Sequence, residues 1–564
     1  MPWVDRAVRL QLVVRVVVAL KASVGPSVVG RAQRFGEEPV RAMIRAIGAV
    51  IASGTLVVGA GVAGAAPQQQ EDVGLQGVVG SIAWAPCSEP GAPAGVECGK
   101  LSLPVDWSKP RGEKFDLAVA RRKATDPAKR IGIMLINPGG PGGSGVSFAY
   151  GANTYFSAEV QERFDIIGFD PRGVARSQPV KCSLDLLNAQ PSLFPKDQAE
   201  FDKLKAYNQE LAADCRARSG AIFDHADTIA VTNDMDAIRR SLGEQKINYY
   251  GISYGTIMGQ QYAERFGHRV RAMVIDSNMD HSLDAKAFNA TEAATAEDSF
   301  QEFVKWCDRT ESCALHGRDV AAYWDDLLAR ADRGELKDPD DPTRTVTSEE
   351  ITGTAFSVFY GPAWSFLASW LDALGSGTPT PAGMSAFADE TAGNPFPAVF
   401  CQDYQYRVKD YRELAGLVAD AKRLAPHMGG SRLGHYAIAS CIGYPAKANN
   451  PQHRLRITSS PKILMLNALH DPATAYAWAA NAHKQTRDKT VLLTYEGWGH
   501  GAYDRSECTL GASDDYLVDL TVPRDGTRCA AVEPQPQTAS VDSAGTTALP
   551  AGPKPGLPGW QRQR

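Results

Sequence analysis

The segment Ile247-Asn-Tyr-Tyr-Gly251-Ile-Ser253-Tyr-Gly255 decides how this chain of 564 residues is organised. It joins a short apolar run, a serine between two glycines and, from Thr256 to Phe266, a stretch with helical spacing. A G-x-S-x-G sequence between a strand and a helix is a nucleophile elbow, a sharp turn in which glycine removes the side chains that would clash. We therefore predict that Ser253 is a catalytic nucleophile.

The same alternation of strand and helix recurs on both sides of this segment. Helical spacing is found over 232–242 and again around 475–483. Such a rhythm indicates a mostly parallel sheet with helices on both faces. The short apolar runs that we predict to be its strands are 100–105, 115–121, 131–136, 164–169, 247–250, 270–275, 463–466 and 490–494.

A nucleophilic serine needs a histidine base and an acid that orients it. In a fold with this elbow, the acid and then the histidine follow the serine, each just after a later strand. Asp471 follows the run 463–466, and His500 lies in a Gly-rich loop after the run 490–494. We predict Ser253, Asp471 and His500 as the catalytic triad, with Glu496 as the alternative acid.

The oxyanion hole of such an enzyme requires two backbone N–H groups aimed at the developing negative charge. One is expected from Tyr254, which follows the nucleophile. The other is expected from Gly140, in the Gly-rich loop after the strand at 131–136. The same loop could be read as a phosphate loop, but it lacks the Lys-Ser/Thr ending of that motif.

Five segments are expected along the chain. An upstream extension and a signal peptide occupy 1–66, and the first part of the strand–helix core occupies 67–280. The rhythm is then lost over 281–455, where mostly helical sequence predicts a lid inserted over the sheet. The second part of the core is 456–530. The Pro-, Ala-, Gly- and Ser-rich stretch 531–564 is predicted to be a disordered tail.

The first 65 residues have the composition of an export signal. Basic residues precede an apolar run from Ala46 to Val62, which ends in small residues, as in a secretory signal peptide of about 43–65 that starts at Met43. An unusually long n-region that begins at Met1 is the alternative. Without this leader the chain holds 51 basic and 61 acidic side chains, a net charge of −10. That charge argues against nucleic acid as a partner, and no later stretch suggests stable insertion into a membrane.

Ten cysteines, all beyond the predicted leader, agree with an oxidising compartment. They contain no C-x-x-C pair, so we expect no zinc site, and we expect no cofactor. Cysteines that are neighbours in the sequence are favoured as partners. The expected pairs are Cys87–Cys98, Cys182–Cys215, Cys307–Cys313, Cys401–Cys441 and Cys508–Cys529.

Three motifs resemble the proline iminopeptidase branch of the α/β-hydrolases: Pro138-Gly-Gly-Pro-Gly142, Asp170-Pro-Arg-Gly-Val-Ala-Arg-Ser177 and the elbow at Ser253. Together with the cysteines and the segments Cys401-Gln-Asp403 and Asn467–Thr474, the chain is similar to secreted tripeptidyl aminopeptidases of actinobacteria, with a TAP-like C-terminal region. The resemblance implies an α/β-hydrolase fold and an exopeptidase that releases short peptides, tripeptides among them, from free N-termini. It also places the triad and the oxyanion residues on the positions predicted above.

Two departures accompany this resemblance, and three classes of function stay open. Pro138 replaces the histidine of the cytosolic relatives' glycine loop, and Asp276-Ser-Asn278 replaces an Asp-Gly pair, so substrate preference is open. An aminopeptidase must also pair the ammonium group of its substrate with an anion. Asp403 is our candidate for that role, and a structural carboxylate is the alternative. A carboxylesterase or lipase with the same triad is the competing function, and a binding protein without activity is a third.

Overall fold

The computed structural model describes residues 80–339, 341–377 and 393–534. These residues belong to the second of two compact units, Asp72–Arg564. The predicted extension and signal peptide (1–66) and nearly all of the predicted tail (531–564) lie outside the described residues.

One sheet of ten strands forms the centre of this unit, in the order β1-β2-β3-β5-β4-β6-β7-β8-β9-β10. The first four strands in that order pair antiparallel, and every later pair is parallel. This is the α/β-hydrolase fold, as the sequence predicts. The strands are β1 Ala85–Pro86, β2 Val96–Pro104, β3 Lys114–Arg122, β4 Gly132–Asn137, β5 Phe164–Phe169, β6 Ile247–Ile252, β7 Val270–Asp276, β8 Ile463–His470, β9 Thr490–Trp498 and β10 Arg528–Cys529.

The central strands are apolar along their whole length because both faces of the sheet are covered. In β6, Ile247 and Tyr249 point into one core layer, whereas Tyr250 and Ile252 point into the other. Side chains of α8, α9 and α17 fill the first layer, and side chains of α4, α5 and α18 fill the second. The helices of the core are α4 Gly145–Tyr155, α5 Ala158–Arg163, α6 Leu184–Asn188, α7 Gln198–Ser219, α8 Thr228–Ser241, α9 Gly255–Phe266, α17 Tyr476–Gln485 and α18 Glu507–Asp519.

The long helix α7 has no counterpart among the predicted elements. Its apolar residues Phe201, Leu204, Tyr207 and Leu211 recur at helical spacing, a signal that the sequence does contain. Part of this apolar face packs on the insertion rather than on the sheet, since Phe201 and Leu204 share a cluster with Leu414 of α15.

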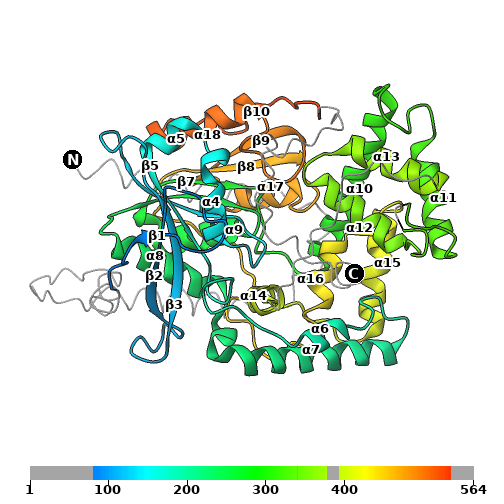
Figure 1. Ribbon diagram of the computed structural model, residues 1–564, viewed down its shortest axis with the longest axis horizontal. Helices are drawn as coiled ribbons and strands as arrows, with labels where there is room; N and C mark the ends of the chain where they lie inside the picture. Colours follow the sequence, from blue (N-terminus) through cyan, green and yellow to red (C-terminus); the bar gives the residue numbers. More distant parts are fainter. Residues whose placement is uncertain (1–79, 340, 378–392, 535–564) are drawn as a thin grey trace, which may run out of the picture. The chain divides into compact units, whose positions relative to one another are not determined.

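The segment between β7 and β8 is a helical insertion, as predicted. The helices α10 to α13 with α15 and α16 form a group on one side of the strands (Figure 1). Many of their apolar side chains pack into a core of their own, around Phe300, Trp324 and Leu367. The insertion helices are α10 Ala285–Arg309, α11 Val320–Asp332, α12 Ser348–Phe359, α13 Trp364–Ser376, α14 Pro395–Asp403, α15 Tyr411–Leu424 and α16 Arg432–Ala439.

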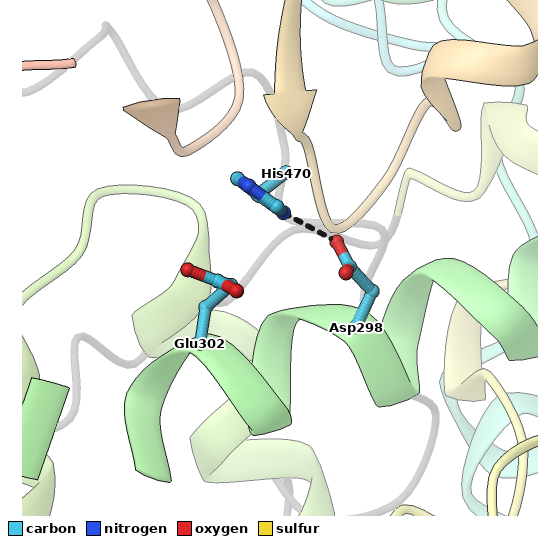
Figure 2. Close-up of side chains that lie close together, drawn as sticks. All are labelled: Asp298, Glu302 and His470. Carbon is cyan, nitrogen blue, oxygen red and sulfur yellow. Dashed lines mark hydrogen bonds and ion pairs between the residues drawn. The ribbon is translucent and has the colours of Figure 1, made fainter. Parts of the chain in front are cut away.

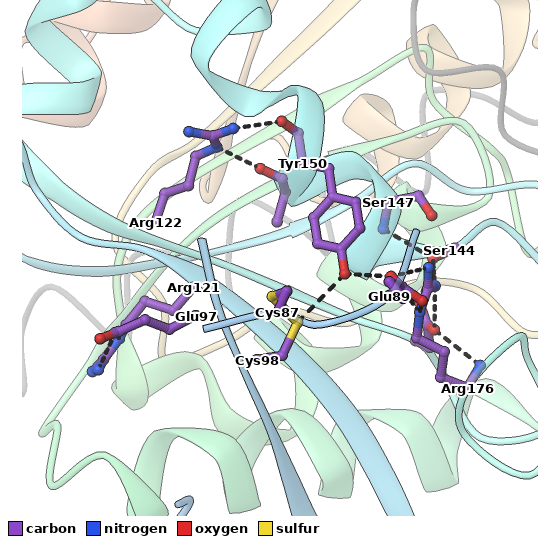
Figure 3. Close-up of a disulfide and its surroundings, with 12 residues drawn as sticks. Cys87, Glu89, Glu97, Cys98, Arg121, Arg122, Ser144, Ser147, Tyr150 and Arg176 are labelled. Atoms are coloured by element: carbon purple, nitrogen blue, oxygen red, sulfur yellow. Dashed lines mark hydrogen bonds and ion pairs between the residues drawn. A yellow bond between two sulfur atoms is a disulfide. The ribbon is translucent and has the colours of Figure 1, made fainter. Parts of the chain in front are cut away.

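Five disulfides are formed, and they are the same five pairs that sequence order favours. Figure 3 shows the surroundings of the first, Cys87–Cys98, which ties the start of the described chain to β2. The hydroxyl of Tyr150 lies between Cys98 Sγ and the carboxylate of Glu89, and Arg176 donates to the same carboxylate. Arg176 belongs to the Asp170–Ser177 motif, so this part of the motif has a structural role.

Candidate functional site

Ser253 lies on the turn between β6 and α9, with a left-handed backbone of φ 60°. A non-glycine residue holds that conformation at a cost, which is typical of a nucleophile elbow. The two flanking positions must be glycine because a Cβ atom at either one would clash with its surroundings. A Cβ on Gly251 would come within 2.7 Å of the oxygen of Gly255, and a Cβ on Gly255 within 2.9 Å of the oxygen of Asn137.

His500 and Asp471 form a buried pair at the ends of β9 and β8. Nδ1 of His500 lies 3.0 and 3.1 Å from the two carboxylate oxygens of Asp471, and Asp471 has no exposed surface. Thr474 donates to the same carboxylate through its amide and its hydroxyl, at 2.9 and 2.8 Å. Burial acts to raise the pKa of Asp471, but the charge and hydrogen bond of His500, with hydrogen bonds from Ser277 and the Thr474 amide, hold it below its usual value. A charged acid of this kind can orient a histidine base.

Asp276, at the end of β7, connects the serine turn to the histidine loop. Its main-chain oxygen accepts a hydrogen bond from the amide of Ser253 (2.9 Å). Its carboxylate accepts the amides of Ala502 and Tyr503, both at 2.9 Å, just after His500. Burial raises the pKa of Asp276 to about 6, against the lowering effect of these bonds. From the sequence, Asp276 stands out only as the first residue of Asp276-Ser-Asn278, which replaces an Asp-Gly pair of the similar family.

Within the described residues, neither the hydroxyl of Ser253 nor Nε2 of His500 takes part in a hydrogen bond. Catalytic hydrogen bonds are commonly long without substrate and tighten only in the reacting complex. The two groups therefore stay candidates for a nucleophile and its base.

The glycine loop after β4 packs directly on the elbow. A Cβ on Gly139 would lie 2.7 Å from the amide nitrogen of Tyr254 and 2.8 Å from Cβ of Ser253. The amide of Gly139 already donates to Asn137 Oδ1 at 2.8 Å. The amides of Gly140 and Tyr254, the two predicted oxyanion donors, have no hydrogen-bond partner among the described residues. Both amides are thus free to donate to a substrate oxygen.

Known proteins are similar in sequence to this chain over most of its length. The serine protease Hip1 of Mycobacterium tuberculosis is 31% identical over 481 residues, which cover 79% of this chain and 91% of that protein. The chain belongs to the TAP-like family of α/β-hydrolases. The model of that family, described as TAP-like protein, matches residues 428–529.

Two other relatives of this TAP-like hydrolase carry different names. The tripeptidyl aminopeptidase of Streptomyces lividans is 29% identical and aligns with 81% of this chain and 88% of its own. Carboxylesterase B of M. tuberculosis is 30% identical and aligns with 77% of this chain and 86% of its own. The chain is therefore a serine hydrolase of the TAP-like family, for which both peptidase and esterase activity are plausible.

The competing acid and histidines have other partners. Glu496 accepts a hydrogen bond from Arg528 at 2.6 Å, and its side chain is 39% exposed. Nδ1 of His483 lies 2.8 Å from the Thr490 hydroxyl, inside the core. His470, next to the predicted acid, contacts Asp298 on α10. These contacts favour Asp471 and His500 over these competitors as the candidate acid and base.

The insertion touches the acid and the histidine of the predicted triad. Thr295 on α10 donates to the main-chain oxygen of Asp471 at 2.8 Å. Tyr360, directly after α12, accepts the amide of His500 at 2.8 Å, and its ring packs edge-on against the imidazole with centroids 5.0 Å apart. No local sequence pattern indicates Tyr360 or Thr295, because each contact joins segments more than 130 residues apart.

Asp403 is completely buried, and both of its carboxylate oxygens are occupied. Thr228 donates through its amide and its hydroxyl, Asn450 donates at 2.8 Å, and the hydroxyl of Tyr254 donates at 2.7 Å. Burial and the nearby charge of Asp227 raise the pKa of Asp403 to about 7, against the effect of its donors. A carboxylate with four internal donors fits the structural alternative better than a free anchor for a substrate amine.

Glu292 on α10 is a buried acid with an unused oxygen. Ser431 donates to Oε2 at 2.6 Å, but Oε1 has no hydrogen-bond partner among the described residues. Burial raises the pKa of Glu292 well above its usual range, the bond from Ser431 opposes this, and the nearby carboxylate of Asp471 adds to it. The hydroxyl of Tyr406 is also buried and has no hydrogen-bond partner among the described residues. It lies near enough to Glu292 for the charge of that acid to raise its pKa.

Among the described residues, one group has the composition of a metal site: Asp298, Glu302 and His470 (Figure 2). The side chains of these three residues already have hydrogen-bond partners, either within the group or next to it. Asp298 pairs with His470 at 2.7 Å, while the oxygens of Glu302 accept Lys305 and the indole of Trp498, each at 2.7 Å. We interpret the group as a structural link between α10 and the ends of β8 and β9.

The cysteines indicate the compartment in which the protein folds. Five disulfides suggest that the chain folds outside the cytoplasm. In the described ranges, no helix has both the length and the hydropathy needed to cross a membrane.

Proposed function

We propose that the chain is a serine exopeptidase that removes short peptides, tripeptides among them, from free N-termini. Ser253 Oγ attacks the carbonyl carbon of the scissile bond while His500 takes its proton, and the resulting oxyanion lies against the amides of Gly140 and Tyr254. His500 then gives the proton to the leaving amine as the C–N bond breaks. Water, deprotonated in turn by His500, hydrolyses the acyl-enzyme on Ser253.

Glu292 is the observation that carries the choice of an aminopeptidase. An ammonium group has three donors and needs an anion where water is excluded. Its charge would favour the ionised form of a buried acid and so counteract the raised pKa of Glu292. Glu292 Oε1 and the Tyr406 hydroxyl are two buried acceptors without partners. Thr295, one helical turn after Glu292, holds the main chain of Asp471. We therefore assign the amine-binding role, first considered for Asp403, to Glu292.

The names of two relatives support a peptidase, but the name of a third supports an esterase. Hip1 is a serine protease, and the Streptomyces relative is a tripeptidyl aminopeptidase. Carboxylesterase B supports a second candidate, an esterase that uses the same triad. An esterase has no use for a buried carboxyl group with an unpartnered oxygen, so the two proposals differ in their demand for a free amine.

Three substrates separate these functions: a tripeptide anilide with a free amine, its N-acetylated form, and a short-chain ester. Acetylation removes the substrate charge and leaves Glu292 buried without its partner, so an exopeptidase should prefer the free peptide by roughly 10²-fold or more in kcat/KM. Equal rates on the two peptides would instead indicate an endopeptidase, and turnover of the ester alone would indicate an esterase.

We further propose that the protein is secreted through its predicted leader. The mature chain found in a culture supernatant should begin at Ala66 or Pro67. N-terminal sequencing tests this, and a mature protein that retains Val40 would contradict both the cleavage site and a start at Met43.

A further inference from the structure

Helix α14 contacts both sides of the predicted oxyanion hole. At its first residue, Pro395 lies against the glycine loop, where a Cβ on Gly142 would come within 2.7 Å of Pro395 Cγ. At its last residue, Asp403 accepts the hydroxyl of Tyr254 at 2.7 Å. Gly142 follows one predicted oxyanion donor by two residues, and Tyr254 is the other.

The Asp403 end of α14 is held by the body of the protein rather than by solvent-exposed contacts. Cys401 is bonded to Cys441, which lies just beyond α16. Gln402 donates to the main-chain oxygen of Phe223 at 2.7 Å. Asp403 itself accepts two donors from Thr228 at the start of α8. Because α14 is fixed at these points, the side chains that it contacts are held in place as well.

Tyr254 depends on this end of α14 for its side-chain orientation. The residue precedes α9 and is almost completely buried. Its phenol has one hydrogen bond, to Asp403, and its ring lies 6.1 Å from that of Phe400 on the same helix. An anchored side chain restricts the backbone that carries it, and that backbone includes the amide of Tyr254.

We propose that α14 is a positioning element of the oxyanion hole, in which Asp403 aligns the amide of Tyr254 through its phenol. The inference rests on the proposed role of Ser253 as a nucleophile. Asp403 and Pro395 do not touch the reacting atoms in this scheme. They set the direction in which the two N–H donors point, and preorganised donors are what stabilises an oxyanion.

The test compares an oxo-ester with the matching thionoester, whose sulfur accepts hydrogen bonds poorly and so gains little from the hole. In Tyr254→Phe the amide remains and only the anchor to Asp403 is lost. We expect kcat on the oxo-ester to fall by about 10-fold, less than the 10²- to 10³-fold cost of removing a donor outright. The rate on the thionoester should stay close to that of the wild type, so the oxo-to-thiono ratio should fall by the same factor.

Two further variants complete the test. At pH 8, above the pKa of about 7 of Asp403, Asp403→Asn should lower the same ratio, because the new amide nitrogen would face one of the donors that the carboxylate accepts. Tyr262→Phe is the matched control. It removes the hydroxyl of a different buried tyrosine, which lies on α9 and donates to Asp236, and it should keep the wild-type ratio. If Asp403→Asn does not fold, Tyr254→Phe still decides the question.

The outcomes separate this inference from the proposed function. If a Ser253→Ala variant still hydrolyses the oxo-ester, Ser253 is not the nucleophile, and both proposals are overturned. If Ser253→Ala is inactive but Tyr254→Phe melts like the wild type and keeps the wild-type ratio, only the positioning role of α14 is overturned.

Discussion

The amide of Ser253 donates a hydrogen bond of 2.9 Å to the main-chain oxygen of Asp276, on the neighbouring strand. The carboxylate of the same aspartate holds the two amides that follow Gly501 in the histidine loop. One residue at the end of β7 thus fixes both the serine turn and the loop of the predicted base. Relative placement of catalytic groups to within about 1 Å matters, since such a shift can cost about 10²-fold in rate.

Replacing the nucleophile tests the central claim. Ser253→Ala should lower kcat by about 10⁴-fold or more, the usual cost of removing the serine of a triad. The fold should remain, because the elbow accepts a smaller side chain. Ser369→Ala, an exposed helical serine, is the control and should be fully active. Activity of Ser253→Ala within tenfold of the wild type would rule out this nucleophile.

Asp276→Asn should reduce turnover by roughly 10- to 100-fold, because a displaced histidine loop misplaces the base. The amide offers one acceptor oxygen where the carboxylate receives Ala502, Tyr503 and the phenol of Tyr250. Since the pKa of Asp276 is about 6, the wild-type carboxyl is itself protonated below that pH. The ratio of wild-type to variant kcat/KM should therefore shrink as pH falls from 8 to 5. A ratio that stays constant over this range would show that the charge of Asp276 is not used.

Glu292→Gln tests the amine-binding acid. The variant should lose most of the roughly 10²-fold preference for free over acetylated peptide, because a neutral amide cannot pair with an ammonium group. Its hydrolysis of a small neutral ester should be largely preserved. Glu297→Gln is a matched control on the same helix, since Glu297 bonds His427 and not the region near Asp471. A preference that survives in Glu292→Gln would move the amine anchor to another residue.

The sequence predicted the sheet because buried parallel strands are continuous apolar runs. Phe164–Phe169 is strand β5 with both ends as predicted, and β7 extends the prediction by one residue, to Asp276. The predicted N-terminus of helix α8 is four residues late, because Asp227 caps it and Thr228 begins it. Local patterns locate an element well, but a capping hydrogen bond decides its first residue.

The candidate site was less predictable wherever it depends on long-range contacts. Order along the chain suffices to propose Asp471 and His500, and the structure brings these two side chains into contact. It cannot distinguish a binding carboxylate from a structural one, and Asp403 illustrates this. An acid two residues after a cysteine suits both roles, and only its donors Thr228, Tyr254 and Asn450, brought together from distant segments, separate them.

Disulfide removal should cost stability in order of loop length. The loop-entropy model gives about 4 kcal/mol for the Cys401–Cys441 pair, 40 residues apart, and about 2 kcal/mol for Cys307–Cys313, 6 residues apart. The double alanine variants of each pair should therefore differ in urea midpoint, with the longer loop losing more. Equal losses would mean that local packing, rather than chain entropy, sets the contribution of these bonds.

The pH dependence of stability provides a test of Asp403 that needs no substrate. An unfolded aspartate has a pKa of about 3.9, whereas the pKa of Asp403 in the folded protein is about 7. Between these values the folded state binds more protons than the unfolded state, so the stability contributed by protonated Asp403 is complete below about pH 4 and is lost as pH rises to 7.

Asp403→Asn removes this titration, and its stability should fall less steeply over that range. The difference in slope should approach 1.4 kcal/mol per pH unit. Asp276 titrates in the lower part of the same window in both proteins, so the measured quantity is the difference between the two urea-unfolding series from pH 4 to 7. Asp488→Asn, which removes an exposed carboxylate, serves as the control and should keep the wild-type slope. Parallel curves for Asp403→Asn and the wild type would mean that Asp403 is charged throughout, held by its four donors against the cost of burial.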